Sequence, residues 1–327
     1  MKEAYLYEKD ANMVVCRLCP HACRIAEGGF GVCGVRQVKD GVLYTHAYGK
    51  AIAASKDPIE KKPFFHVMPG TRSLSIATAG CNFRCSFCQN WQISQLKNEL
   101  PGEDFPVDEV IKEAEGCGSI AYTYTEPTIF FEYAYDIARK AREHKHLFVT
   151  NGYITGDAIR MLSHYLDAVN IDLKGFSDDF YRKVCGARLQ PVLDAIRLYH
   201  ELGVFVEITT LIVPGYTDTE ETLNNIAEFI ASVDPFIPWH ISRFSPHYKM
   251  QETPATPEET VERAIEIGRE KGLKYIYPGN MPGHALESTF CHNCGKRVIE
   301  RRGYHVGATY LNGKKCSFCG TELPLLL

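Results

Sequence analysis

The chain has little that would place it in a membrane or on nucleic acid. No apolar run in its 327 residues approaches the length that spans a bilayer, and residues 1–5 lack the apolar core of a signal peptide. A net charge of −4 gives no basic excess for binding phosphates. Internal repeats and low-complexity tracts are absent as well. We therefore expect a cytoplasmic protein that binds neither a membrane nor nucleic acid.

Cysteine, in contrast, is abundant. The chain has 13 cysteines, and disulfides are disfavoured in the cytosol, so clustered cysteines point to metal sites. Eleven of them fall into three clusters, whereas Cys117 and Cys185 stand apart and are interpreted as small buried side chains. Apolar residues make up 45% and charged residues 23%, which is typical of a globular protein with a sizeable core.

The central cluster is the most informative of the three. Cys81, Cys85 and Cys88 follow an apolar stretch at 74–77 that is typical of a buried strand. Thiolates are the usual ligands of iron–sulfur clusters, and three thiolates leave one iron of a [4Fe-4S] cluster free to bind a substrate or cofactor. A zinc knuckle or a set of buried free thiols is the alternative, but no fourth Cys or His lies close by.

This C-x3-C-x2-C run, with the aromatic Phe87 before its last cysteine, resembles the signature of radical SAM enzymes. The resemblance implies that S-adenosylmethionine (SAM) chelates the free iron. An electron from the cluster then cleaves SAM, and the 5′-deoxyadenosyl radical so formed abstracts hydrogen from a substrate. It also implies a flavodoxin- or ferredoxin-type electron donor.

Strand-like and helix-like segments alternate between residues 71 and 287, which predicts a parallel sheet. Together with the resemblance, this favours an α/β fold with an incomplete (β/α)6-type barrel, whose chemistry lies at the carboxyl ends of the strands. The predicted strands are 73–79, 119–124, 146–150, 168–173, 204–210, 239–244 and 274–277. The predicted helices are 128–144, 157–165, 191–202, 219–233 and 258–271, with Asp218 and Thr256 as N-caps of the last two.

Polar residues follow several of these strands. Glu126-Pro127 resembles a Gly-Gly-Glu-Pro-like segment that binds the SAM amino group in radical SAM enzymes, although both glycines are missing. A helix start with Pro at its first position is the alternative. Asp172 and Lys174 point to one face of a strand and could grip a zwitterionic amino acid, or form a plain surface ion pair. These two residues and the segment around Asn151 resemble SAM-site segments of pyruvate formate-lyase activating enzymes.

The last predicted SAM contact is His247. It follows Pro246 much as a SAM-site histidine follows a Pro-Tyr pair in the activating enzymes, while His240 or Arg243 are alternatives for the same role. Lys61, Lys62 and His66 precede the first barrel strand, and we interpret them as part of a solvated loop rather than of the active-site mouth.

Residues 1–70 form a predicted N-terminal cysteine-rich module. Cys16, Cys19, Cys23 and Cys33 supply four thiolates within 18 residues, which suit either structural zinc or an auxiliary iron–sulfur cluster, and of the two we favour a structural site. His21 is a further candidate ligand. The tight cysteine repeat of a ferredoxin-like insert, which glycyl-radical activating enzymes carry, is absent from the sequence.

Residues 288–327 form a second small module. Cys291, Cys294, Cys316 and Cys319 make two C-x2-C-G knuckles, typical of a zinc-ribbon or rubredoxin-like site with zinc as first choice and iron as second. His292 lies between two ligands and is interpreted as a bystander. So small a module needs its metal to stay folded.

Over nearly its whole length the chain resembles the AmmeMemoRadiSam-system radical SAM enzymes, a branch related to pyruvate formate-lyase activating enzymes. The segments that carry this resemblance are 16–21, 57–63, 78–85, 122–128, 150–154, 172–176 and the terminal knuckles. It implies Memo-like and AMMECR1-like protein partners without naming a substrate. A glycyl-radical activating enzyme is the close alternative, and a non-catalytic metal- or redox-binding partner protein is the alternative from another class.

Overall fold

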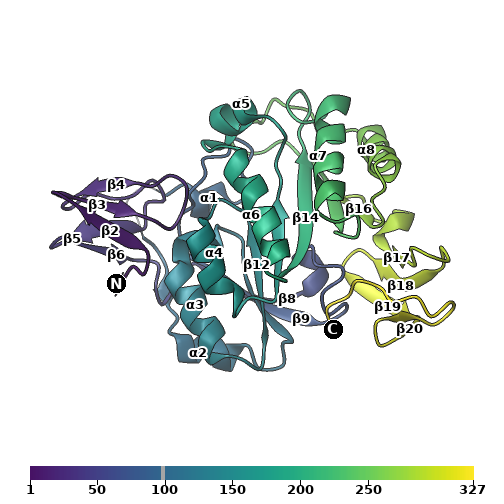
Figure 1. The fold of residues 1–327 in the computed structure, drawn as a ribbon, viewed down its shortest axis with the longest axis horizontal. Helices are drawn as coiled ribbons and strands as arrows, with labels where there is room; N and C mark the ends of the chain where they lie inside the picture. Colours follow the sequence, from purple (N-terminus) through teal and green to yellow (C-terminus); the bar gives the residue numbers. More distant parts are fainter. Residues whose placement is uncertain (97–99) are drawn as a thin grey trace.

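An eight-stranded sheet forms the centre of the molecule (Figure 1). The computed structural model describes residues 1–96 and 100–327. Neighbouring strands follow the order β16-β15-β14-β13-β12-β11-β9-β8; all pairs are parallel except β8 with β9. The strands are β8 (Ala53–Pro58), β9 (Arg72–Ala77), β11 (Ser119–Tyr122), β12 (Lys145–Thr150), β13 (Ala168–Asp172), β14 (Phe205–Ile212), β15 (Trp239–Arg243) and β16 (Ile276–Gly279). This order confirms the predicted α/β fold and fits a partial barrel.

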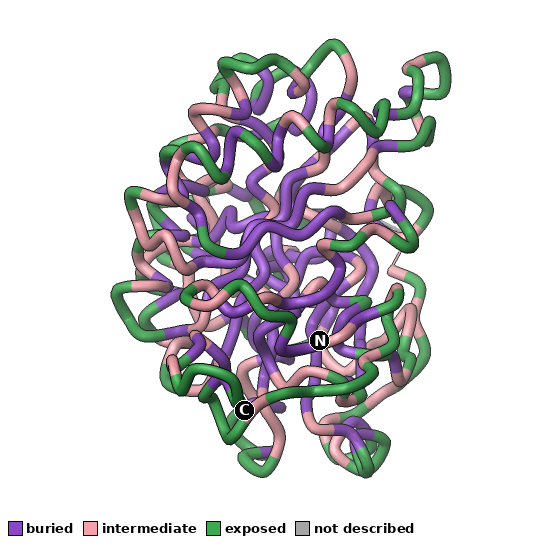
Figure 2. Tube along the Cα trace, turned by 90° about the vertical axis from the view of Figure 1, so that its right-hand side faces the viewer, coloured by how far each residue is buried: buried purple, intermediate pink, exposed green. Residues whose placement is uncertain are grey.

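Amphipathic helices connect the parallel strands and cover the outside of the sheet. In α6, for example, Val192, Ile196 and Tyr199 are buried at helical spacing. Figure 2 shows the buried trace running through the middle of the molecule, with exposed turns around it. The helices are α1 (Trp91–Ser94), α2 (Val107–Glu113), α3 (Phe131–Lys140), α4 (Gly156–Ser163), α5 (Asp178–Phe180), α6 (Gln190–Glu201), α7 (Glu220–Val233) and α8 (Glu258–Glu270). A 3-10 turn, η2 (Pro127–Phe130), precedes α3, and a π-helical turn, η3 (Tyr181–Cys185), follows α5.

The predicted N-caps of α7 and α8 are wrong. Thr219 caps α7 by accepting from the Thr222 backbone N–H, while the Asp218 carboxylate accepts from Gly215 in the preceding turn. The Thr256 hydroxyl is used inside the fold, where it donates to the carbonyl of Ile212. Short polar side chains near a helix start can serve either the helix or the loop before it, which sequence does not decide.

The N-terminal module is built from two small antiparallel sheets, seen in purple at one end of Figure 1. The first joins β1 (Lys2–Glu3), β6 (Val42–Thr45) and β5 (Arg36–Lys39), and the second joins β2 (Tyr7–Asp10), β3 (Met13–Cys16) and β4 (Arg24–Ala26). The next strand along the chain, β7 (Lys50–Ala51), forms a short antiparallel pair with β10 (Glu103–Asp104), which comes after β9 and α1. β8 already belongs to the central sheet, although it lies before the predicted module boundary at residue 70.

The segment between β8 and β9, which begins with η1 (Ile59–Lys61), packs against the amino-terminal part of the barrel. The buried Glu207 of β14 accepts from the backbone N–H groups of Phe65 and His66 and pairs with His240 at 2.6 Å. His66 is fully buried and also reaches the Tyr277 hydroxyl of β16 at 2.7 Å. This end of the barrel is therefore closed by the chain itself.

The prediction of a solvated loop at Lys61, Lys62 and His66 is wrong for two of the three. Lys61 is exposed, but Lys62 is 2% exposed and forms an ion pair with Asp57 at 2.6 Å. Burial lowers the pKa of Lys62 to about 8 and that of His66 to about 4. The side chains that cover these groups, Tyr124 over Lys62 and Tyr277 beside His66, come from distant parts of the chain, so the local sequence gave no sign of them.

The C-terminal module lies at the other end of the molecule, in yellow in Figure 1. It contains β17 (Thr289–Phe290), β18 (Arg297–Arg302), β19 (His305–Thr309), β20 (Leu311–Asn312) and β21 (Lys315–Cys316), after a short turn η4 (Ala285–Glu287). The buried Arg301 joins it to the barrel by donating to the Phe65 carbonyl. Leu326 forms a parallel bridge with Val67, so the last residues pack on the segment between β8 and β9.

Across the described residues, 1–96 and 100–327, every helix is too short or too polar to traverse a lipid bilayer.

Candidate active site

The loop that carries Cys81, Cys85 and Cys88 leaves the carboxyl end of β9. Gly80 starts it with φ +98°, and a Cβ at Gly80 would meet the Cys33 carbonyl oxygen at 2.8 Å, so this position requires glycine. The backbone N–H groups of Arg84 and Ser86 bond to the carbonyls of Cys185 and Val184 at the end of η3. The loop is thus held from both sides, which gives the three thiols a fixed placement.

Polar groups lie within hydrogen-bonding distance of the sulfur atoms of Cys81 and Cys88. Cys81 Sγ accepts from the Phe83 backbone N–H at 3.3 Å and is 3.9 Å from Asn151 Nδ2. Cys88 Sγ lies 3.2 Å from the Ser94 hydroxyl of α1. Contact with the Cys185 thiol, together with burial, raises the pKa of Cys85 well above its usual value. Metal binding here would therefore release protons, and N–H donors would stabilise the sulfur ligands that remain.

The sequence-predicted pair Asp172 and Lys174 lies beside this loop, at the end of β13. Lys174 Nζ is 2.8 Å from Asp172 Oδ2 and 5.9 Å from the centre of the Phe87 ring. Burial opposes a charge on Lys174, but the Asp172 carboxylate more than offsets it and holds the pKa of Lys174 well above its usual value. A fixed ammonium and a half-exposed carboxylate therefore stand next to Cys85 and Phe87.

Glu126 and Asn151 lie at the ends of β11 and β12. The Glu126 carboxylate is 2% exposed and accepts from the Thr128 backbone N–H and hydroxyl, the Thr150 hydroxyl and the Asn151 backbone N–H. Asn151 in turn donates to Asn82 Oδ1 at 2.8 Å, next to Cys81. Glu126 thus acts as the cap of η2 and as an anchor for Asn151, which matches the helix-start alternative noted for it.

His247 lies in the loop that follows β15, where its side chain is exposed. The same loop crosses the cysteine loop, because the Lys249 backbone N–H donates to the Ser86 carbonyl at 3.1 Å. The two alternatives to His247 have other partners. His240 is buried against Glu207 in the closed end of the barrel, and Arg243 bonds to Glu258 and to the Thr256 carbonyl.

Comparison with known proteins gives the family of this arrangement. The sequence pattern of the Radical SAM superfamily matches residues 75–230, the stretch that holds the three-cysteine loop and the strand ends around it. An uncharacterised protein of Methanocaldococcus jannaschii is 45% identical over 338 aligned residues, which cover 100% of both chains. This chain belongs to the radical SAM superfamily.

More distant relatives agree with that assignment. The pyruvate formate-lyase-activating enzyme of Clostridium pasteurianum is 27% identical over 175 residues, covering 50% of this chain and 71% of that protein. The crystal structure of a radical SAM methyltransferase from Sphaerobacter thermophilus has a TM-score of 0.52 at 15% identity, covering 64% of this chain and 66% of that chain. The second likeness shows a shared fold.

Membership of the superfamily implies a [4Fe-4S] cluster and SAM, and the donor set fits them. One loop offers three thiols and no fourth protein ligand, and backbone and amide N–H groups face the sulfur of Cys81. Cys81, Cys85 and Cys88 would hold the cluster. The Asp172–Lys174 pair carries the two charges that match the amino and carboxylate groups of SAM.

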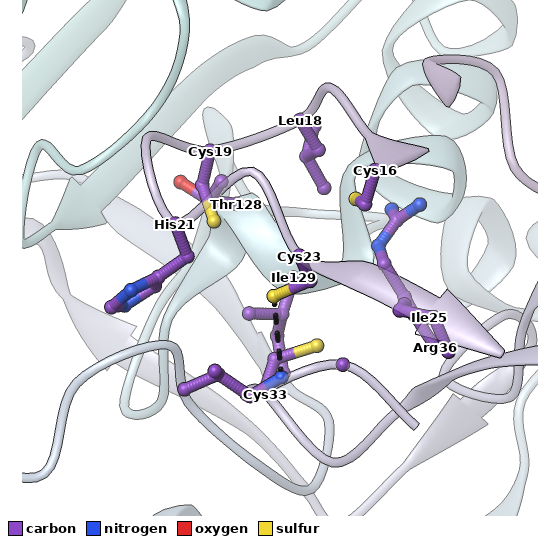
Figure 3. A pocket seen from close by; sticks show the side chains of 12 residues that line it. Cys16, Leu18, Cys19, His21, Cys23, Ile25, Cys33, Arg36, Thr128 and Ile129 are labelled. Carbon is purple, nitrogen blue, oxygen red and sulfur yellow. Dashed lines mark hydrogen bonds between the residues drawn. The ribbon is translucent and has the colours of Figure 1, made fainter. Parts of the chain in front are cut away.

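The N-terminal cysteines of this radical SAM protein also come together in space. Cys16, Cys19, Cys23 and Cys33 line one cavity with the buried Arg36, as Figure 3 shows. Burial raises the pKa of Cys16, Cys19 and Cys33. The fifth candidate, His21, turns its Nε2 to the Asn82 carbonyl at 2.8 Å.

The C-terminal cysteines form a tighter group. Cys291 and Cys319 have their sulfur atoms 3.7 Å apart, and Cys294 and Cys316 have theirs 3.8 Å apart. A single zinc bound at about 2.3 Å from each sulfur in a tetrahedron requires spacings of roughly this size. His292 bonds to Tyr275 through Nδ1, in agreement with a bystander role.

Sequence reasoning missed several residues that hold the site together. Cys185 was interpreted as isolated, yet it contacts Cys85 from a π-helical turn about a hundred positions away. Arg84 donates to the carbonyls of Cys81 and Val32 and so ties the catalytic loop to the N-terminal module. The local sequence does not predict the Cys185–Cys85 or the Arg84–Val32 contact, because both contacts depend on how distant segments pack.

Proposed function

We propose that this chain is a radical SAM enzyme that cleaves SAM reductively and takes a hydrogen atom from a substrate. A cluster bound by Cys81, Cys85 and Cys88 supplies the electron that converts SAM to methionine and a 5′-deoxyadenosyl radical. The observation that carries the proposal is the three-thiol loop, one ligand short, with Phe87, Asp172 and Lys174 beside it. An electron donor of the flavodoxin or ferredoxin type is part of the proposal.

The protein's own residues bind and orient SAM. Lys174 would donate to the SAM carboxylate, and Asp172 would accept from its amino group, because each charge meets its opposite. Asn151 and Phe87 border the same space, and His247 would approach from the loop above Ser86. We assign Glu126 a positioning role through Asn151, since four donors already engage its carboxylate.

The substrate would enter over the inner face of the barrel. The register of β13, β14, β15 and β16 places Leu211, Ser242 and Gly279 on the same face as Asp172, and all four are half-buried. A Cβ at Gly279 would collide with Ser242 Oγ at 2.4 Å. Leu211, Ser242 and Gly279 are small or apolar. At this end of the barrel they would exclude water from the radical, so that it reacts only with the bound substrate.

The experiment is anaerobic reconstitution with iron and sulfide, followed by dithionite and SAM, with 5′-deoxyadenosine measured. The proposal requires 5′-deoxyadenosine above background, and its loss in Cys85→Ala. Cys117→Ala is the matched control, because Cys117 is a buried cysteine outside the three sets. Background levels in the wild type, or full activity in Cys85→Ala, would refute the proposal.

A second candidate is a glycyl-radical activating enzyme, whose substrate is a protein backbone. The similarity to pyruvate formate-lyase-activating enzyme favours it, and the absence of a ferredoxin-like cysteine repeat from the sequence speaks against it. Incubation with a candidate glycyl-radical protein and detection of a glycyl radical by electron paramagnetic resonance (EPR) separates the two. The AmmeMemoRadiSam assignment and its Memo-like and AMMECR1-like partners stay predictions, testable by co-purification.

For the C-terminal cysteines we propose structural zinc. The sulfur spacing near 3.8 Å and the distance of this module from the three-cysteine loop support a closed site without chemistry. Metal analysis of the purified protein should give one zinc per chain that survives mild treatment with an iron chelator.

A further inference from the structure

The four N-terminal thiols are arranged differently from the four C-terminal ones. Among the described residues, 1–96 and 100–327, only the C-terminal set forms a group whose ligand atoms all lie within 4.8 Å of one another. The N-terminal thiols instead surround a cavity. In a [4Fe-4S] cluster each thiolate binds a different iron, so the four sulfurs stand further apart than around one ion. The wider arrangement fits a cluster better than zinc.

A second, independent observation points to an anionic ligand in this cavity. Arg36 lines it and is 2% exposed. Its Nη2 bonds to the buried Glu132, but Nε and Nη1 have no partner in the protein. A buried guanidinium with unpaired N–H groups costs free energy unless something accepts them. The sulfur atoms of a negatively charged cluster are acceptors of the right charge.

The cavity also adjoins the catalytic loop through three contacts. The Cys33 carbonyl packs against Gly80, the residue before Cys81. His21, between two of the thiols in sequence, bonds to the carbonyl of Asn82, the residue after Cys81. Arg84 links the carbonyls of Val32 and Cys81. Cys33 contacts Gly80, and Gly80 is bonded to Cys81. Only Gly80 therefore lies between a ligand residue of the N-terminal site and a ligand residue of the catalytic loop.

We propose that Cys16, Cys19, Cys23 and Cys33 hold a second iron–sulfur cluster, which receives hydrogen bonds from Arg36 and passes electrons to the catalytic cluster across the His21–Asn82 contact. An external one-electron donor, such as a reduced flavodoxin or ferredoxin, reduces the N-terminal cluster by one electron. Transfer of that electron oxidises the N-terminal cluster again and reduces the catalytic one, so no further oxidant or reductant is needed. The electron-transfer half rests on the function proposed above.

The first test removes the catalytic cluster and leaves the N-terminal module unaltered. The variant Cys81→Ala/Cys85→Ala/Cys88→Ala is reconstituted anaerobically with iron and sulfide, in the presence of equimolar zinc. It should keep about half of the iron and sulfide of the wild type, about four irons instead of about eight, with a [4Fe-4S] EPR signal after reduction. Zinc in place of iron, or no metal at the N-terminal cysteines, overturns the proposal.

The second test addresses Arg36 in the same background. Arg36→Gln/Glu132→Gln removes the guanidinium together with its partner, so that no single buried charge is left behind. Its matched control is Arg24→Gln/Asp10→Asn, which removes an exposed ion pair from the same module. The first pair should shift the midpoint potential of the N-terminal cluster to more negative values, and the control should not. Equal potentials in both variants would contradict the role of Arg36.

The third test measures electron transfer in the protein with both clusters. In His21→Phe the reduced catalytic cluster should appear several-fold more slowly in freeze-quench EPR after mixing with a reduced flavodoxin, while both potentials stay unchanged. His46→Phe is the control, because His46 lies in the same module but bonds to Gln37. Equal rates in the wild type and His21→Phe refute the transfer route.

The two proposals fail in different ways. A zinc-filled N-terminal site in a protein that makes 5′-deoxyadenosine with dithionite refutes the second cluster and leaves the proposed function standing. Iron at the N-terminal cysteines in a protein that never cleaves SAM does the reverse.

Discussion

The N-terminal and C-terminal modules each bring four cysteines together, and they do so at opposite ends of the molecule. The C-terminal sulfurs lie 3.7–3.8 Å apart in pairs, on knuckles with Cys319 exposed to solvent. The N-terminal sulfurs are spread around a cavity with a buried arginine and abut the catalytic loop. Equal numbers of the same ligand can thus serve different tasks, and spacing and neighbours distinguish them.

The largest expected effect is on SAM cleavage, and it should follow substitution of the cysteines in the catalytic loop. Cys81→Ala or Cys88→Ala should reduce SAM cleavage by at least a hundredfold, because two thiolates do not hold a cluster in place. Cysteine substitution outside the three sets, as in Cys117→Ala, should leave the rate within about twofold. Product analysis by liquid chromatography measures both, and retained cleavage in either loop variant would contradict the placement of the chemistry.

The next effect concerns the charges beside that loop. Lys174→Met should weaken SAM binding by roughly tenfold to a hundredfold, since a charge-assisted hydrogen bond to a carboxylate contributes about 1.5–3 kcal/mol. Lys183→Met is a matched control, because Lys183 is an exposed lysine on η3 that pairs with Asp179. Calorimetric titration with SAM gives the affinity of each variant. Equal affinities of Lys174→Met and Lys183→Met would show that Lys174 does not bind SAM.

Loss of the C-terminal metal should affect stability far more than chemistry. Cys316→Ser should release the zinc and lower the melting temperature by roughly 5–10 °C, because the module and its Arg301 contact to the barrel depend on the metal. SAM cleavage per folded protein at low temperature should change little. A loss of cleavage as large as in the catalytic loop variants would mean that the two ends do not differ as described.

Glu126 gives a smaller and more discriminating effect. Glu126→Gln should reduce SAM affinity by less than about threefold while destabilising the protein by about 1–3 kcal/mol. The reason is that the new amide NH2 group would face the N–H and O–H donors that bond to the buried Glu126 carboxylate. A loss of SAM affinity as large as that of Lys174→Met would instead support the direct contact between Glu126 and SAM that the sequence predicted.

The smallest effect on SAM binding and cleavage is expected at the closed end of the barrel, where we expect the stability of the protein to depend on pH. Burial lowers the pKa of His66 to about 4, so between about pH 6.5 and pH 4 the unfolded chain binds a proton that the folded one does not. The free energy of unfolding should therefore decrease as the pH is lowered through this window, by up to roughly 3 kcal/mol from this group. His66→Gln should flatten the dependence in denaturant titrations, whereas His305→Gln, on an exposed histidine, should not.

Local pattern and sheet geometry suffice to predict which residues are neighbours at the strand ends. Asp172, Lys174 and the cysteine loop were expected together, because parallel strands bring their carboxyl ends to one edge, and Lys174 lies next to Asp172 and near Phe87. Their roles stay predictions. Sequence reasoning failed where burial depends on distant partners. Lys62 and His66 were interpreted as solvated, yet the distant Tyr124 lies against Lys62, and Tyr277 and Pro324 contact His66. Cys185 meets Cys85 by tertiary packing alone.

Sequence also could not distinguish the two four-cysteine sites by metal. Four thiolates are offered in both, and what differs is their separation and the buried Arg36 with its free N–H groups. Neither quantity follows from spacing along the chain, because it depends on how the loops of the module fold round the cavity.

X-ray absorption at the iron and zinc edges of the Cys81→Ala/Cys85→Ala/Cys88→Ala variant, reconstituted with both metals, tests the central claim most directly. Our account predicts iron with iron–iron scattering at the N-terminal cysteines and one zinc bound by four sulfurs at about 2.3 Å at the C-terminal ones. Two zinc sites and no iron–iron scattering would contradict it.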